Sequence, residues 1–154
     1  MPLTGLSEAE KVHLNLAWHR LDPWPDAVSG LTRLKRKYII APMSNGNVAL
    51  LVNMAKYAGL PWDCIFSAEQ ARHYKPDKQV YLLAPDYLDV RPDQVLMVAA
   101  HKNDLRAAKS VGLKAAFVPR PLEHGPKAQV DVTHDPAFEF NVADFNELAA
   151  KLGA

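Results

Sequence analysis

The sequence of 154 residues has a single cysteine, Cys64, and no long apolar run. One cysteine excludes an internal disulfide and a thiolate-rich metal site. A helix that crosses a bilayer needs about 20 consecutive apolar residues, and no stretch approaches that length. The first residues, Met-Pro-Leu-Thr, have neither the basic start nor the apolar segment of a secretory signal. We therefore expect a cytoplasmic protein without membrane contact.

An excess of charge of one sign is also lacking. The 18 Lys and Arg residues nearly balance the 17 Asp and Glu residues, which leaves a formal net charge of +1. Proteins that bind nucleic acid through its phosphates need a basic surplus, so we expect no nucleic-acid partner. The one basic run contains Arg33, Lys35, Arg36 and Lys37. It is either a nucleic-acid contact or a solvated helix end favoured by the helix dipole, and we favour the second interpretation.

The remaining composition is typical of one globular domain. Hydrophobic residues make up 49% of the chain and charged residues 23%, and a chain of this length buries about two thirds of its unfolded surface. The best candidate boundary is the Asp-Pro-Trp-Pro segment at residues 22–25, because proline cannot continue a helix. It separates an N-terminal helical segment, residues 1–22, from a larger domain, residues 23–154.

Apolar strands alternate with amphipathic helices along the chain. Ser7 and Glu10 form the pattern of a capping box, which predicts a helix over residues 7–20. A second helix follows the boundary, with Val28, Leu31 and Leu34 facing inward. Further predicted strands cover residues 38–43, 64–66, 95–99 and 115–118, and further predicted helices lie around residues 48–55, 80–87, 104–112 and 143–152. This alternation predicts an α/β fold with a parallel sheet flanked by helices.

Three groups of polar residues are candidates for a functional site. In an open parallel sheet ligands bind beyond the carboxyl ends of the strands, which directs attention to Ser44 with Asn45, to Lys75, and to the His-Lys-Asn-Asp segment at residues 101–104. Ser44 either holds an anion together with helix N-terminal amides or caps its own helix. Lys75 either compensates a negative charge or is a surface lysine. Asp104 is either a site carboxylate or a helix cap.

Four segments, in this order, resemble the haloacid dehalogenase (HAD) superfamily, and within it the type II 2-haloacid dehalogenases. They are AWHRLDPWPD at residues 17–26, MSNGN at 43–47, YKPD at 74–77 and MVAAHKNDL at 97–105. The last three are similar to the second, third and fourth motifs of the superfamily. Each motif is short, but their order and spacing are specific, and the resemblance extends from about Trp18 to the C-terminus. It implies a HAD-like, Rossmann-like core.

The resemblance also implies a mechanism and roles for individual residues. In the family an aspartate displaces halide from a small anionic 2-haloacid, and water then hydrolyses the aspartyl ester. Ser44 and the Asn45 amide would hold the substrate carboxylate. Lys75 would stabilise the charge of the nucleophile and of its ester. Asp104 would anchor Lys75 and help to position the hydrolytic water.

The fourth motif distinguishes the branches of the superfamily. HAD phosphatases resemble G-D-x-x-x-D here, and the first acid of that pattern helps to bind magnesium. This chain has Ala100 at the matching position, followed by His101. Loss of a hard oxygen ligand weakens a magnesium site, so we expect no metal and no cofactor. His101 and Asn103 are further candidates for contact with the substrate, although a histidine beside a strand end more often caps or packs.

The first motif of the superfamily, an apolar strand that ends in D-x-x-G-T, is not found in the sequence. In the family this strand is central and carries the nucleophile. We therefore expect an N-terminally truncated core that lacks its central first strand and is inactive alone, with residues 1–22 as a remnant of the segment between cap and core. Residues 38–42 and 95–99 would then have unpaired edges. They either pair directly or are bridged by a separate segment or by a second copy, as in a homodimer or a strand-exchanged oligomer.

Three functions remain open at this point. The first is a dehalogenase-like hydrolase of a 2-haloacid. The second is a non-catalytic remnant that binds anions through Ser44, Asn45 and Lys75 or associates with itself. The third, which Ala100 disfavours, is a metal-dependent phosphatase. Halide release separates the first from the second, and magnesium-stimulated hydrolysis of a phosphomonoester would mark the third.

Overall fold

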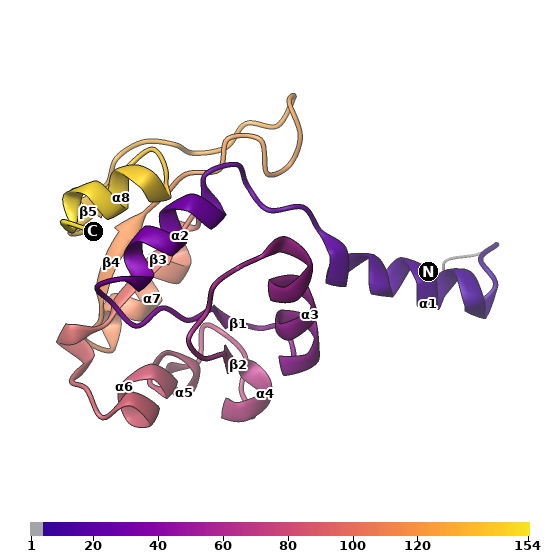
Figure 1. Cartoon of the computed structure of the whole chain (residues 1–154), viewed down its shortest axis with the longest axis horizontal. Coiled ribbons are helices and arrows are strands. Elements are labelled where there is room, and N and C mark those ends of the chain that lie inside the picture. The colour runs from indigo at the N-terminus through magenta and orange to yellow at the C-terminus, as the bar shows by residue number, and fades with distance from the viewer. Residues whose placement is uncertain (1–4) are drawn as a thin grey trace.

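The computed structural model of the chain describes residues 5–154 and shows parallel strands flanked by helices (Figure 1). Two strands, β1 (Met43–Ser44) and β2 (Phe66–Ser67), form one sheet, and β3 (Leu96–Ala99), β4 (Lys114–Phe117) and β5 (Phe140–Asn141) form another. Every strand pair is parallel. The helices are α1 (Glu8–Ala17), α2 (Ala27–Lys35), α3 (Val48–Ala58), α4 (Ala68–Ala71), α5 (Lys78–Tyr81), α6 (Leu83–Leu88), α7 (Lys102–Ser110) and α8 (Phe145–Lys151), with 3-10 turns η1 (Trp18–Arg20) and η2 (Pro92–Gln94). The predicted α/β class is confirmed.

The two sheets are not joined by a ladder within residues 5–154. The expectation that residues 38–42 pair directly with residues 95–99 is therefore wrong. The backbone of Ile40 bonds only toward Asp63: its N–H donates to Asp63 Oδ2 at 2.9 Å and its carbonyl accepts from the Asp63 N–H at 2.9 Å. Within residues 5–154, no strand lies on the side of this segment opposite β2, and regular pairing with β2 begins at Met43. Side chains, not backbone hydrogen bonds, connect this segment to the larger sheet.

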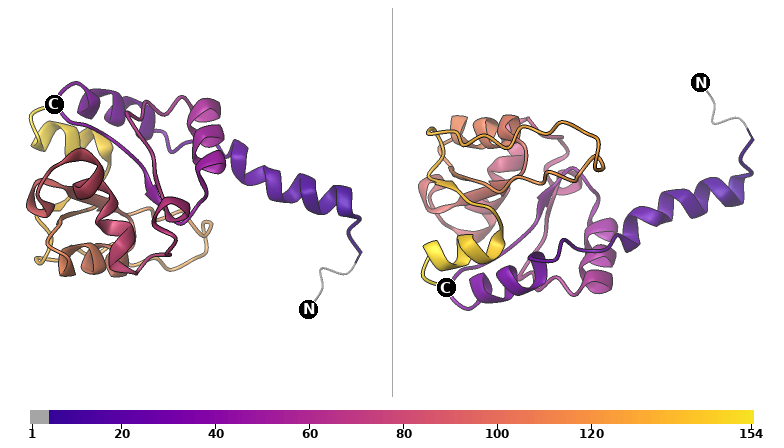
Figure 2. Two further views of the ribbon diagram at one scale, coloured as in Figure 1. Left: turned by 90° about the horizontal axis from the view of Figure 1, so that it is seen from below. Right: turned by 90° about the horizontal axis from the view of Figure 1, so that it is seen from above.

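Helix α1 begins as predicted and projects away from the body of the molecule (Figures 1 and 2). The Glu10 N–H donates to Ser7 Oγ at 3.3 Å, and the Ser7 N–H donates to Glu10 Oε2 at 2.7 Å. None of its residues is buried, and the apolar side chains of Val12, Leu14 and Leu16 are exposed. Among residues 5–154, no helix has the length and apolar character needed to span a bilayer.

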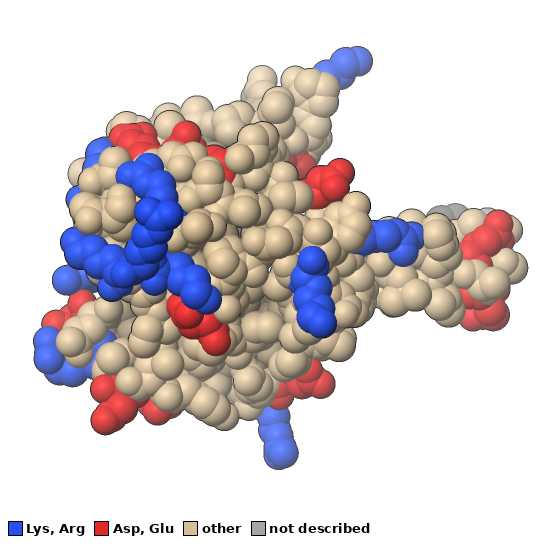
Figure 3. Space-filling model, in the orientation of Figure 1, with Lys and Arg blue, Asp and Glu red and all other residues tan. Residues whose placement is uncertain are grey.

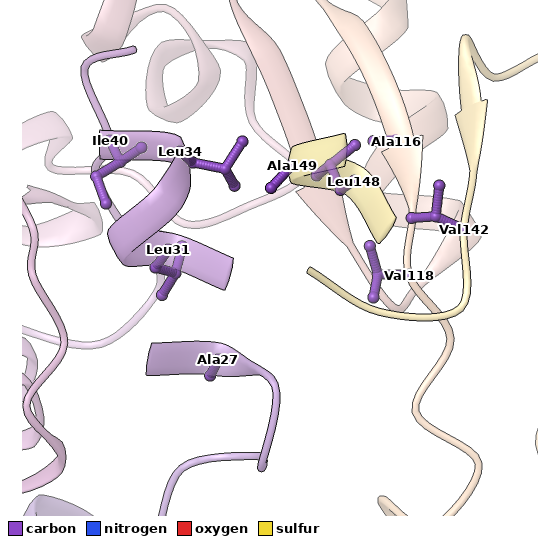
Figure 4. Packing of buried hydrophobic residues seen from close by; sticks show 9 residues of the cluster. All are labelled: Ala27, Leu31, Leu34, Ile40, Ala116, Val118, Val142, Leu148 and Ala149. Atoms are coloured by element: carbon purple, nitrogen blue, oxygen red, sulfur yellow. The ribbon is translucent and has the colours of Figure 1, made fainter. Parts of the chain in front are cut away.

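The main core lies between α2, α8 and the larger sheet. Figure 4 shows Leu34 and Leu31 of α2 facing this core, with Leu148 and Ala149 of α8 beside the sheet. Gly30 permits the close approach of the two helices, because a Cβ atom there would lie 2.4 Å from Cβ of Phe145. A residue with a side chain at position 30 would force α2 and α8 apart.

The basic run at the end of α2 binds to the end of α8 and to a neighbouring loop. Arg33 donates to the carbonyl of Ala154 at 2.8 Å, and Lys37 donates to the carbonyl of Leu152 at 2.9 Å. Lys35 pairs with Asp63 at 2.8 Å. Figure 3 shows blue side chains gathered over the α2 and α8 side of the visible face. Arg33 and Lys37 thus satisfy carbonyl groups at the C-terminal end of α8, which is where positive charge is favourable.

Several details of burial, and one strand, were not predicted from the sequence. On α6 the Tyr87 side chain is 66% exposed, whereas Tyr81 on α5 is fully buried. Only Met97 of β3 is buried, and the other three residues of the strand are half-buried. The reason is that β3 is an edge strand with a partner on one side alone. Strand β5 was not predicted, because two residues are too few for a periodic pattern.

An enclosed ion pair ties the start of α2 to the loop after β4. The Arg120 guanidinium donates to both oxygens of Asp26, at 2.8 and 2.9 Å, and lies 5.3 Å from the Trp24 ring and 5.4 Å from the Phe145 ring. The Phe145 N–H also donates to Asp26, at 2.9 Å. Burial raises the pKa of Asp26, but these hydrogen bonds outweigh it and hold the pKa below its ordinary value.

We expect Asp26→Asn to lower the free energy of unfolding by about 3 kcal/mol at neutral pH, because it leaves an enclosed arginine without its counter-charge. Since the pKa of Asp26 is lowered in the folded state, its contribution is present above the unfolded pKa of about 3.9 and is lost as pH falls through the lower folded value. The difference from the parent chain should therefore shrink below about pH 4. Urea denaturation at several pH values measures this.

The matched control is Asp86→Asn on the exposed surface of α6, which should change stability by less than about 0.5 kcal/mol. Equal losses in the two variants would contradict the special role of the Asp26–Arg120 pair.

Candidate active site

An ion pair between Lys75 and Asp104 forms the centre of the candidate site. Lys75 lies in the turn between α4 and α5, and Asp104 lies in the first turn of α7, just beyond the carboxyl end of β3. Lys75 Nζ donates to Asp104 Oδ2 at 2.9 Å, and the two side chains are 14% and 20% exposed. The structure therefore contains the contact that the resemblance implied, and the role of the pair in chemistry stays a prediction.

Tyr81 completes this pair and was missed by sequence reasoning. Its hydroxyl donates to Asp104 Oδ1 at 2.6 Å, so both carboxylate oxygens of Asp104 have a donor. Burial, and then the hydrogen bond to Asp104, raises the pKa of Tyr81 well above its ordinary value, which keeps the hydroxyl protonated as a donor. Lys75 Nζ lies 5.6 Å from the centre of the Tyr81 ring, within range of a cation–π interaction. The signal that could have found it is that a buried tyrosine needs a polar partner.

Asn45 fixes the backbone of Lys75. The Lys75 N–H donates to Asn45 Oδ1 at 2.7 Å, and Asn45 Nδ2 lies 3.5 Å from the Lys75 carbonyl oxygen. The side chain of Asn45 is therefore committed to positioning Lys75. The group of Asn45 that remains a candidate for the substrate carboxylate is its backbone N–H.

Ser44 ends β1 and does not cap the helix that follows. Asn47 is the N-cap of α3, because its Oδ1 accepts from the Leu50 N–H at 2.8 Å. Ser44 Oγ instead accepts from the Gly46 N–H at 3.0 Å. The Ser44 hydroxyl proton has no acceptor within residues 5–154, so it can donate to a ligand. The capping alternative for Ser44 is wrong.

Asp104 does not cap a helix either, and its two neighbours in the motif point elsewhere. His101 is the N-cap residue of α7 by position, but its side chain lies 2.9 Å (Nε2) from Oε2 of Glu123. Asn103 is exposed and accepts a long contact of 3.5 Å from Arg106. In the described part of the chain, neither His101 nor Asn103 is hydrogen-bonded to Lys75 or Asp104. Their roles as substrate contacts stay predictions.

Lys102 holds the long loop after β4 and was also missed. Its Nζ donates to Asp131 Oδ2 at 2.7 Å and to Thr133 Oγ1 at 2.8 Å, and it lies 5.2 Å from the centre of the Phe117 ring. Hydrogen bonds from Lys102 and Thr133 lower the pKa of Asp131 well below its ordinary value. Lys102 thus fixes the part of the loop nearest to α7, and Asp131 is occupied as its counter-ion.

A hollow of about 550 Å³ borders Asn45, which holds the Lys75 backbone, while Lys75 and Asp104 themselves do not line it. The polar residues that line it are Asn45, Asn47, Glu69, Arg72, His73 and Tyr74. Within residues 5–154, Asp104 is the one carboxylate paired with Lys75. The described chain therefore offers a cation and hydrogen-bond donors for an anion, but no second carboxylate beside Lys75 to attack it.

Comparison with known proteins identifies the family. The profile of haloacid dehalogenase-like hydrolases matches residues 4–112, so the chain belongs to that family. It is 36% identical over 107 residues to (S)-2-haloacid dehalogenase 1 of Pseudomonas sp. (strain CBS-3), covering 68% of this chain and 47% of that protein. It is 35% identical over 113 residues to (S)-2-haloacid dehalogenase 4A of Burkholderia cepacia, covering 71% of this chain and 49% of that protein.

Solved structures give the same family over nearly the whole chain. A defluorinating L-2-haloacid dehalogenase matches with a TM-score of 0.92 and 46% identity, covering 98% of this chain and 62% of that one. The L-2-haloacid dehalogenase of Xanthobacter autotrophicus, with chloropropionic acid covalently bound, matches with a TM-score of 0.80 and 25% identity, covering 97% and 68%. The HAD-like fold expected from the motifs is thus confirmed. The chain spans about half the length of the curated relatives it matches.

We expect Tyr81→Phe to lower the free energy of unfolding by about 2 kcal/mol, because a buried hydrogen bond to a charged group is lost. The matched control is Tyr87→Phe, since Tyr87 is 66% exposed and keeps its ring against Phe66 in the variant. Urea denaturation of both variants measures the effect. A Tyr81→Phe protein as stable as the control would show that the hydroxyl does not support Asp104.

Proposed function

We propose that this chain supplies the substrate-binding and charge-stabilising part of a 2-haloacid dehalogenase site. The observation that carries the proposal is the Lys75 ammonium, mostly shielded from solvent and held 2.9 Å from Asp104 beyond the strand ends. The relatives named as 2-haloacid dehalogenases support the substrate class. A small 2-halocarboxylate has the negative charge that such a cation attracts.

In this proposal each group has one task. The substrate carboxylate accepts hydrogen bonds from the free Ser44 hydroxyl and from the Asn45 N–H. A nucleophilic carboxylate attacks the carbon that bears the halogen, and the halide leaves with the bonding electrons. Water then attacks the carbonyl of the ester, which releases a 2-hydroxy acid and restores the carboxylate. Lys75 stabilises the negative charge of the carboxylate before attack and on the ester oxygen during hydrolysis.

The nucleophilic carboxylate is the missing part. Both oxygens of Asp104 accept hydrogen bonds, from Lys75 and Tyr81, which leaves Asp104 as the anchor of Lys75 and not as the attacking group. We therefore propose that halide release needs a carboxylate from outside residues 5–154. The chain by itself binds the substrate and does not turn it over.

A second candidate function is a non-catalytic anion-binding domain, and the same shortage of carboxylates around Lys75 favours it. A phosphatase is disfavoured, since the alanine methyl group at position 100 offers no oxygen to magnesium. Chloride release and binding must be measured together to distinguish a dehalogenase part from a general anion binder.

We expect the purified chain to bind 2-chloropropionate in isothermal titration calorimetry and to release no chloride above the buffer rate. Loss of the Ser44 hydroxyl in Ser44→Ala should weaken binding at least about tenfold, because one hydrogen bond to a charged group contributes about 1.5–3 kcal/mol. Unsubstituted propionate and inorganic phosphate serve as competing anions. A preference for 2-chloropropionate supports the dehalogenase assignment, and equal binding of all three supports the general anion binder.

Chloride release by the parent chain that disappears in Lys75→Ala would contradict the claim that the nucleophile lies elsewhere, while establishing the dehalogenase activity itself. Absence of any 2-chloropropionate binding would contradict the proposed function.

We also propose that copies of the chain associate through the strand edges that face the gap between the two sheets. Within residues 5–154, β1 pairs only with β2, and β3 pairs only with β4, so each has a free edge. Ile39, in the segment that leads into β1, has an apolar side chain that is 61% exposed. Unpaired strand edges are sites of pairing with another chain.

Sedimentation equilibrium should show a dimer or larger oligomer whose fraction rises with concentration. A charge on an edge blocks pairing, so Ile39→Lys should shift the chain toward monomer. Leu14→Lys, which places the same charge on the uncovered helix α1, is the matched comparison. Dissociation by Leu14→Lys alone would place the interface on α1 and contradict association through the edges.

A further inference from the structure

A cluster of three metal-binding side chains lies at the rim of the molecule, outside the Lys75–Asp104 pair. His101 follows β3, while Glu123 and His124 lie in the loop after β4. One ligand atom from each of the three residues lies within 4.8 Å of the others. His101 Nε2 lies 2.9 Å from Glu123 Oε2. The chain fold brings together residues that are more than twenty positions apart.

We propose that His101, Glu123 and His124 bind a divalent transition-metal ion such as Zn²⁺. Two imidazole nitrogens and one carboxylate oxygen are a donor set that zinc takes in proteins, at distances of about 2.0–2.2 Å. In a tetrahedral site with such bonds, ligand atoms lie about 3.4 Å apart. Small side-chain rotations bring the present cluster to that spacing, because all three side chains are exposed. Magnesium and calcium prefer oxygen ligands, so the site should select against them.

The backbone that carries Glu123 and His124 is held in place before any ion arrives. The Glu123 N–H donates to the Arg120 carbonyl at 3.0 Å, and the Gly125 N–H donates to the Leu122 carbonyl at 3.0 Å. Arg120 is itself fixed by its two hydrogen bonds to Asp26. An ion at this cluster would therefore contact Glu123 and His124 from an ordered turn and His101 from the start of α7. Binding requires side-chain movement only, which lowers its entropic cost.

Such an ion would keep a free coordination position. Three protein ligands leave the fourth position of a tetrahedral zinc site to water or to another small ligand. His101 lies three residues before Asp104 in the chain, so the ion would bind at the rim of the candidate active site. The ligands differ from the strand-end carboxylate that binds magnesium in phosphatases, and the site is independent of the proposed dehalogenase function.

Isothermal titration calorimetry of the full chain with ZnCl₂ tests the proposal, and we expect one ion per chain. Loss of a group that merely orients a metal ligand weakens affinity about 10–100-fold, and loss of a direct ligand should cost no less. His124→Gln and His101→Gln should therefore each raise the dissociation constant at least about tenfold. Titration with CoCl₂ gives a second readout, because a site with nitrogen and oxygen ligands should produce a visible absorption band that is lost in the same variants.

The matched control is His134→Gln, an exposed histidine in the same loop, which should leave the zinc affinity unchanged. A large excess of MgCl₂ should not displace the zinc. Circular dichroism verifies that each variant is folded. The proposal is overturned if the parent chain takes up no ion, if His134→Gln weakens binding as much as His124→Gln, or if His101→Gln and His124→Gln bind zinc like the parent.

Discussion

The candidate site depends on the ion pair between Lys75 and Asp104. An ammonium group that is 14% exposed has lost much of its hydration, and such a charge is tolerated only with a counter-charge and hydrogen bonds. Asp104 supplies the counter-charge, Tyr81 satisfies its second oxygen, and Asn45 fixes the backbone on the lysine side. These residues come from four separate places in the sequence, so the pair also joins the small sheet with its helices to the larger sheet.

The division into two sheets follows from the hydrogen-bond partners on each side of the strands. The Ile40 backbone is satisfied on the β2 side by Asp63, and β3 is satisfied on the β4 side. Nothing within residues 5–154 forms a ladder across the gap between them. The fold nevertheless matches dehalogenase structures with TM-scores of 0.92 and 0.80. Side-chain packing of α2, α8 and β4, together with the Asp26–Arg120 pair, supports this arrangement in the described residues.

The predictable parts of the structure are those specified by neighbouring residues or by the order of the motifs along the chain. The capping box at Ser7 and the alternation of strands with helices needed only neighbouring residues. The ordered motifs also placed Lys75 beside Asp104, because strand ends of a parallel sheet meet at one edge. Tyr81 escaped prediction because residues 80–87 were expected to form one helix, whereas the structure has two short helices, with Tyr81 buried on α5 and Tyr87 exposed on α6.

Contacts made by loops were not predictable in the same way. Lys102 meets Asp131, and His101 meets Glu123, across more than twenty residues of chain, and the acidic partner of each pair lies in the loop after β4. No periodic pattern specifies such pairs. The same limit applies to Ser44, for which sequence position left capping and anion binding equally open until Asn47 was found to cap α3. Local hydrogen bonds of short loops decide these cases.

The central claim is that the substrate anion binds beside the Lys75 ammonium, which Asp104 holds in place. The most direct measurement follows the side-chain NMR signal of Lys75, assigned with Lys75→Met, while 2-chloropropionate is added to the isotope-labelled chain. The account predicts a saturable shift of the Lys75 signal, with little change in the signal of the exposed Lys78 nearby. A Lys75 signal that stays constant, or that moves only in parallel with that of Lys78, would contradict the account.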